Sequence, residues 1–119
     1  MTAKRLMKAL GVDIAAKQCY NQELYNEHTR VFGDVTITQS WVSNKTIFGL
    51  ALLPLSEIAF FKRDCRYSHQ RTHLVVTLLF KGGKRYDLPC FYNEYQSKMM
   101  ALLTERCPQA NQRDYGTYV

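Results

Sequence analysis

The sequence predicts an α+β domain in which an antiparallel, strongly bent β-sheet or partial barrel is capped by a C-terminal α-helix. The first observation is a strand pattern at 73–80, a glycine turn at 81–84 and a second strand at 85–88. The second is that roughly five or six strand patterns follow one another in hairpin order before one long helical pattern. A twisted antiparallel sheet of this size tends to bend into two layers or a partial barrel, which the helix can then cover.

Residues 1–31 are expected to form an N-terminal helical segment in front of the sheet domain at 32–119. Residues 2–10 have a short helical pattern, and Gly11 is a typical C-terminal stop. Asp13 can cap a second helix that continues to about Glu27. The first helix either packs on its own domain or frays, or it lies on anionic lipid as a basic amphipathic anchor.

The sheet is expected to open at 33–34. A first strand alternates through 35–42, and Ser-Asn-Lys at 43–45 is turn chemistry. The next strand, 46–53, ends at Pro54 because proline cannot donate to a strand ladder.

A further strand is expected at 56–61, with Ile58 and Phe60 facing opposite to Ala59 and Phe61. Residues 62–72 are polar and charged, which predicts a loop.

The strand at 73–80 is apolar on both faces, so we expect it to be central and covered on both sides. Gly82 and Gly83 tolerate the positive φ of a tight hairpin turn. In the return strand at 85–88 pairing should end near Pro89.

An amphipathic helix at about 91–106 ends the pattern, and Pro108 marks its stop. Glu94 and Lys98 form an i,i+4 ion pair on its solvated side. Its apolar stripe, at spacings of three and four, consists of Phe91, Tyr95, Met99, Leu102 and Leu103.

Several phrases carry a resemblance to a known family. They are VTITQSWV at 35–42, LPLSEIAFF at 53–61, the turn at 81–84 with RYDLP at 85–89, and the final helix with CP and YGTY within 107–118. Over roughly 32–118 the chain resembles the pleckstrin-homology-like (PH-like) fold, in particular the small bacterial PH-like domains of unknown function. The resemblance implies a binding scaffold used for phosphoinositides, peptides or domain–domain contacts, although a shared fold does not transfer a ligand. Lipid-binding members carry several Lys or Arg in the loop between their first two strands, and the corresponding stretch 43–46 offers only Lys45.

The positive charge is concentrated in the second half of the chain. The net charge is +6. Residues 1–60 hold six Lys/Arg and five Asp/Glu, whereas residues 61–119 hold ten and five. The candidate anion-binding residues form two groups, Lys62, Arg63, Arg66 and Arg71 before the central strand, and Lys81, Lys84 and Arg85 at its far end. Eight strand residues place the groups about 25 Å apart, so they are either two patches that permit an extended polyanion or two solvated loop ends.

Metal and cofactor chemistry is not indicated. Cys65, His69 and His73 have a C-x3-H-x3-H spacing that could bind zinc on a helix. In a loop that enters a strand this spacing has no such meaning, and no fourth ligand is evident. The four cysteines contain no C-x-x-C pair, and we expect reduced thiols, two of them in or near the core.

Catalysis is not indicated either. An enzyme needs a nucleophile or paired carboxylates in a cleft, whereas Asp34, Glu57, Asp64 and Asp87 are scattered along the sequence. The longest nearly apolar run, 47–55, is shorter than the roughly 20 residues of a membrane-spanning helix. No secretory segment follows the first basic residues, so we expect a cytoplasmic protein.

The sequence therefore predicts a non-catalytic interaction module that binds another protein or associates with a second copy of itself. An exposed edge strand could pair with another chain, and Tyr92, Tyr115 and Tyr118 either pack on the sheet or contact a partner. The alternative is a basic surface module that binds nucleic acid or anionic membrane lipid.

Overall fold

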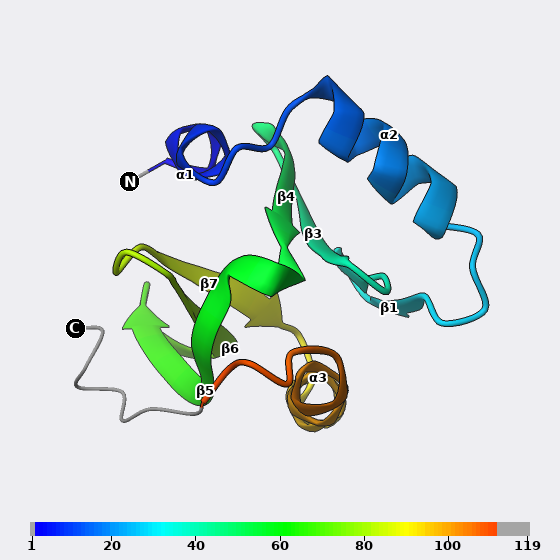
Figure 1. Ribbon diagram of the computed structural model, residues 1–119. Helices are drawn as coiled ribbons and strands as arrows, with labels where there is room; N and C mark the ends of the chain where they lie inside the picture. The colour runs from blue at the N-terminus through cyan, green and yellow to red at the C-terminus, as the bar shows by residue number, and fades with distance from the viewer. Residues whose placement is uncertain (1, 112–119) are drawn as a thin grey trace. The chain divides into compact units, whose positions relative to one another are not determined.

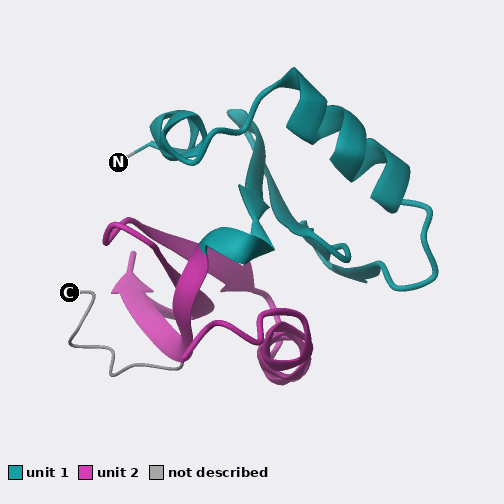
Figure 2. Ribbon diagram, in the orientation of Figure 1, with its two compact units in different colours: residues 1–57 teal, residues 58–119 magenta. Residues whose placement is uncertain are grey.

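The computed structural model describes residues 2–111, which form mixed α and β structure (Figure 1). Within this range the strands make two antiparallel sheets, of four and three strands, which do not close into a barrel. The chain divides into two compact units, residues 1–57 and 58–119, which Figure 2 separates by colour. The predicted α+β class and the C-terminal helix are confirmed.

Two helices begin unit 1, α1 (Ala3–Ala9) and α2 (Ile14–Glu23). Gly11 separates them with a φ of +75°, a left-handed conformation that glycine adopts at no steric cost. The predicted cap is confirmed, because Asp13 Oδ1 accepts a hydrogen bond from Ala16 N at 2.9 Å. Helix α2 ends at Glu23, not at about Glu27.

The sheet of unit 1 has the order β1 (Arg30–Phe32), β2 (Val35–Ile37), β3 (Trp41–Thr46) and β4 (Gly49–Pro54). A 3-10 turn at Leu55–Glu57 follows. The expectation that the sheet opens at 33–34 is wrong, because these residues are the turn between β1 and β2. Residues 30–31, placed by the sequence in the helical segment, already belong to the sheet.

The predicted strand 35–42 is interrupted at 38–40. The carboxylate of Glu23, at the end of α2, holds this interruption in place. Its Oε1 accepts hydrogen bonds from Thr38 Oγ1 at 2.7 Å and from Ser40 N at 2.8 Å. The contact between Glu23 and Thr38, which are fifteen residues apart in the chain, therefore ends β2 early.

The prediction of a turn at 43–45 is wrong, because these residues lie in β3. Ser43 and Asn44 are buried and pair with Thr36 and Val35 of β2. Burial is possible for Ser43 because its hydroxyl forms a hydrogen bond of 2.7 Å with the Tyr20 hydroxyl of α2. The turn lies instead at residues 47–48, between Thr46 and Gly49.

Unit 2 is a three-stranded sheet of β5 (Ile58–Ser68), β6 (Arg71–Phe80) and β7 (Arg85–Cys90), in that order. Strand β6 is central as predicted, and residues 75–80 are buried. The prediction of a loop at 62–72 is wrong. Residues 62–68 continue β5 and pair with 71–77, and only residues 69–70 form the turn.

Pairing of β7 continues through Pro89, which lies opposite Val75, and ends at Cys90. The predicted stop near the proline is therefore correct to one residue. A proline is tolerated here because β7 is an edge strand, where its missing N–H can face away from the ladder.

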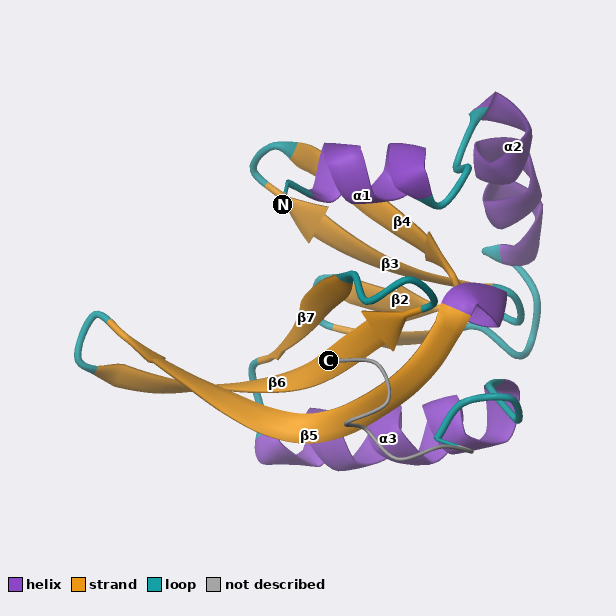
Figure 3. Ribbon diagram, turned by 60° about the vertical axis from the view of Figure 1, so that its left-hand side comes forward, coloured by secondary structure: helices purple, strands orange, loops and turns teal. Residues whose placement is uncertain are grey.

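Helix α3 (Asn93–Arg106) packs against the sheet of unit 2, on one side of β5 and β6 (Figure 3). Met99 and Leu103 of the predicted stripe are fully buried. Phe91 is not part of it, because it precedes the helix and is 63% exposed. The polar Gln96, which is not part of the predicted stripe, is buried. The Glu94–Lys98 ion pair is confirmed.

Candidate interaction surfaces

One face of the unit 2 sheet gathers several of the predicted basic residues. Side chains alternate along a strand and share a face with their cross-strand partners. Lys62 and Arg66 of β5 therefore lie on the same face as Thr77 of β6 and Asp87 of β7. Arg71, opposite Ser68, and Arg85, opposite Leu79, belong to this face as well.

The remaining predicted residues lie elsewhere. Arg63 is on the opposite face of β5, one position from Lys62. Lys81 lies in the β6–β7 turn and Lys84 directly precedes β7. The structure thus brings Arg85 onto the face of Lys62, whereas the sequence placed them in separate patches.

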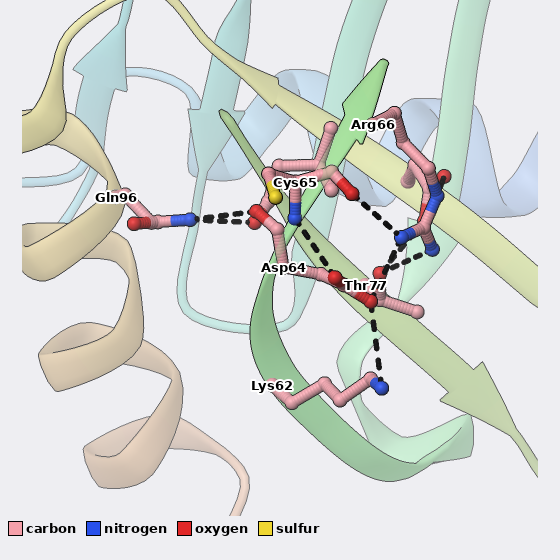
Figure 4. Close-up of polar contacts among 8 residues, drawn as sticks. Lys62, Asp64, Cys65, Arg66, Thr77 and Gln96 are labelled. Carbon is pink, nitrogen blue, oxygen red and sulfur yellow. Dashed lines mark hydrogen bonds and ion pairs between the residues drawn. The ribbon is translucent and has the colours of Figure 1, made fainter. Parts of the chain in front are cut away.

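Two aspartates on this face hold the Arg66 guanidinium: Asp64, which Figure 4 shows beside it, and Asp87. Its Nη1 lies 2.8 Å from Asp64 Oδ2, and its Nε lies 3.0 Å from Asp87 Oδ2. The Thr77 hydroxyl accepts from Arg66 Nη2 at 3.1 Å and donates to Asp87 Oδ1 at 2.8 Å. Lys62 Nζ approaches Asp64 Oδ2 at 3.4 Å.

These contacts shift the pKa values of Asp64 and Arg66. The hydrogen bond from Arg66, with that from Cys65 N, lowers the pKa of Asp64 to about 2. The bond to Asp64 in turn raises the pKa of Arg66. The two carboxylates offset much of the positive charge here, so this cluster stabilises the sheet more than it presents a site for an anion.

At the outer edge of β5, side chains bind the backbone of Phe61 and Cys65. At Phe61 the Asn111 side chain accepts from the backbone N–H at 2.8 Å and donates to the carbonyl at 3.2 Å. Along a strand, the backbone N–H and C=O groups of every second residue point to the same edge. Cys65, four residues after Phe61, therefore also faces the outer edge of β5. There Asp64 Oδ1 accepts from Cys65 N at 2.8 Å, and Arg66 Nη1 donates to Cys65 O at 3.1 Å.

These local bonds occupy groups that a partner strand would need, and Pro89 interrupts β7 in the same way. The expectation that an edge strand of this sheet recruits another chain is therefore not favoured.

The C-x3-H-x3-H residues do not form a cluster. Cys65 pairs with Leu74 and His73 with Arg66, so their side chains point to opposite faces of the hairpin. Among residues 2–111 no three His, Cys, Asp or Glu side chains are placed to hold a metal ion.

All four cysteines are free. The prediction that two of them belong to the core is confirmed by Cys90 and Cys107. Burial raises the pKa of the Cys90 thiol, and it raises that of Cys107 to about 11, which makes both thiols poor nucleophiles.

In unit 1, two highly exposed apolar residues stand next to each other at the turn of the β3–β4 hairpin. Ile47 is 92% exposed and Phe48 is 93% exposed. We call these two residues the hairpin tip. The sequence does not reveal them, because they read as the start of an apolar strand at 46–53. Only the position of the turn shows that they face solvent.

A groove of about 790 Å³ lies beside the tip, between α1, the start of α2 and β4. Its apolar lining includes Ala3, Met7, Phe48, Leu50 and Ala51, and its charged lining residues are Lys4 and Lys17. No acidic side chain occurs among the described residues that line it. The groove therefore combines an apolar floor with positive charge at its rim.

Comparison of the chain with protein-family models, with curated proteins and with solved structures finds no match. Among residues 2–111 no helix has the length and apolar character needed to cross a membrane. The chemistry of the surfaces themselves must therefore support any functional assignment. Tyr115 and Tyr118 lie outside the described residues.

Proposed function

We propose that the chain is a non-catalytic interaction module of PH-like fold that binds another protein through the hairpin tip and its groove. The observation that carries the proposal is the exposure of Ile47 and Phe48, each above 90%. Two adjacent bulky apolar side chains that a hairpin turn exposes to water are a typical interface feature. Their burial by a partner would contribute roughly 3–6 kcal/mol before the cost of association.

The groove defines the chemistry of the partner. Lys4 and Lys17 line it, and Lys45 precedes the tip on β3. A partner segment with an apolar side chain for the groove and acidic side chains for its rim is complementary to this surface. A second copy of the chain is less suitable, because its own groove and the Lys45 that precedes its tip carry the same positive charge.

The PH-like assignment is supported by the order of elements. Four antiparallel strands are followed by three more and then by a helix that packs on the second sheet. The four free cysteines suit a reducing compartment, which supports a cytoplasmic location.

Selection of peptides from a random display library on the full chain tests this function. We expect micromolar binders that combine acidic residues with one large apolar residue. The double substitution Ile47→Ser with Phe48→Ser should weaken them at least tenfold, because it removes the apolar contact and leaves the charges in place. The matched control is Tyr25→Ser, which alters a side chain that is 94% exposed in the same unit but does not line the groove.

Amide chemical shifts should change on α1 and around the β3–β4 turn when such a peptide is added. Peptides that bind the double variant as tightly as the wild type would contradict the proposal. Failure to select any binder would contradict it as well.

A further inference from the structure

The β5–β6 hairpin extends beyond the rest of its sheet. Strand β7 pairs with β6 only between Leu74 and Leu79, whereas β5 and β6 remain paired out to Ser68 and Arg71. Residues 66–73, which we call the arm, thus form a two-stranded ribbon, and no third strand of the described residues 2–111 pairs with it (Figure 3). Its three residue pairs project roughly 10 Å past the end of β7.

The residues of the arm are polar, as in a surface that binds a polar ligand. It contains Arg66, Tyr67, Ser68, His69, Gln70, Arg71, Thr72 and His73, with no aliphatic side chain. No Asp or Glu occurs anywhere from Cys65 to Tyr86, a stretch that holds five Lys or Arg. All arm residues except Arg66 are exposed, and Tyr67 is 74% exposed. The arm therefore contributes almost nothing to a core.

The tip of the arm is strained. His69 and Gln70 have φ values of +51° and +61°, in the left-handed region. A two-residue hairpin turn of this kind favours Asn-Gly, for which positive φ is inexpensive. Non-glycine residues in such a conformation suggest that their side chains have a use at that position.

The charges at the base of the arm are paired. Arg66 binds Asp64 and Asp87 there. The positive charge that remains toward the tip is that of Arg71, accompanied by hydrogen-bonding side chains on both strands. A positively charged two-stranded ribbon that ends in hydrogen-bonding side chains is complementary to a groove lined by phosphates.

We propose that this arm binds duplex DNA by entering the major groove. That groove, about 12 Å wide, admits a two-stranded β-ribbon. Arg71 would contact the phosphates, and Gln70 at the tip would reach base edges, where a glutamine can form two hydrogen bonds with adenine. The deep, narrow major groove of duplex RNA excludes such a ribbon. This site is independent of the groove in unit 1.

Fluorescence anisotropy of a labelled 20-base-pair DNA duplex, titrated with the full chain at 50 mM salt, tests the proposal. We expect micromolar binding that weakens steeply with salt. Arg71→Gln should reduce the affinity about three- to tenfold and lower the slope of log K against log salt by about 1. The matched control is Lys8→Gln, which removes the same charge from an exposed residue of α1.

Gln70→Gly separates binding from folding. Glycine relieves the positive φ, so this variant should melt at a higher temperature than the wild type. It should nevertheless bind DNA more weakly, since the tip side chain is lost. Equal effects of Arg71→Gln and Lys8→Gln, or no binding to duplex DNA, would overturn the proposal. Equally tight, Arg71-dependent binding to duplex RNA or to phosphatidylserine vesicles would also overturn it.

Discussion

Arg66 shows how much of the unit 2 sheet depends on one side chain. It binds Asp64 beside it on β5, Asp87 two strands away and the Thr77 hydroxyl between them. It also donates to the carbonyl of Cys65 at the sheet edge. One guanidinium with five donors can serve these roles together, which a lysine could not do.

The Asp64–Arg66 pair predicts a specific acid response. The folded pKa of Asp64 is about 2, below the roughly 3.9 of an unfolded aspartate. A lowered carboxyl pKa adds stability that is fully present above the unfolded pKa and is lost as the pH falls toward the folded one. We therefore expect Asp64→Asn to flatten the dependence of unfolding free energy on pH between about 4 and 2.

Urea unfolding at several pH values measures this slope. Arg66→Gln should flatten the same window, because it removes the group that lowers the pKa. The effect should be small, since 27% of the Asp64 side chain is exposed and solvent screens the pair. An unchanged slope in both variants would show that the pair does not control acid stability.

Individual residues also show which features of the fold the sequence predicts and which it does not. The Asp13 cap and the Gly11 stop depend only on neighbours along the chain, so the sequence was sufficient for both. Ser43 and Asn44 are typical turn residues by composition, yet β3 contains them because they pair with β2 and because Tyr20, far away in sequence, binds the Ser43 hydroxyl. A propensity cannot anticipate a hydrogen bond to a helix that ends twenty residues earlier.

At the scale of elements, burial decided which strands could be recognised. Strand β6 is buried over 75–80, and its run of apolar residues predicts a strand. The outer half of β5 is charged and alternates between half-buried and exposed residues, so the sequence predicted a loop there. The outer half of β5 pairs with β6 through backbone hydrogen bonds, and the pattern of side chains does not reveal such bonds. The candidate site on the arm was hidden for the same reason: its residues were recognised as basic, but not as a projecting ribbon.

Helix α3 is joined to its sheet by a polar side chain. Gln96 Nε2 donates to the carbonyl of Asp64 on β5 at 3.0 Å (Figure 4). It also donates to the carbonyl of Val75 on β6 at 2.8 Å, so it contacts both strands. The residue is buried among the apolar side chains of the interface. Both amide hydrogens are satisfied, which makes the polar group tolerable there.

Replacement of Gln96 should therefore be costly. Gln96→Leu removes both hydrogen bonds and should lower the free energy of unfolding by roughly 1–3 kcal/mol. Gln96→Glu should cost more at pH 7, because it places a carboxylate against two carbonyl oxygens. That excess should shrink as the pH falls, since a protonated carboxyl regains one donor.

Urea denaturation at pH 7 and pH 5 provides both comparisons. The control is Ser97→Ala, which alters the exposed next residue of the helix and should stay within about 0.5 kcal/mol of the wild type. A Gln96→Glu variant no less stable than Gln96→Leu at pH 7 would contradict the assigned geometry.

At the scale of the whole molecule, the net charge opposes self-association, and so do the strand edges of the unit 2 sheet. The net charge is +6, and the groove and the residues next to the hairpin tip carry lysines. The outer edge of β5 is covered by Asn111, Asp64 and Arg66, and that of β7 is interrupted by Pro89. Both protections are known to prevent sheets from joining edge to edge.

We therefore expect the purified chain to be monomeric at tens of micromolar, with a mass of 13.9 kDa by light scattering at low salt. Twice that mass would contradict this expectation and would make a second copy the first candidate partner. In that case Ile47→Ser with Phe48→Ser would locate the contact, because a dimer built on the hairpin tip must dissociate when the tip loses its apolar side chains. A dimer that persists in this variant would place the interface elsewhere. Association that appears only at high salt would instead show that positive charge keeps the copies apart, since screening weakens repulsion while apolar contacts remain.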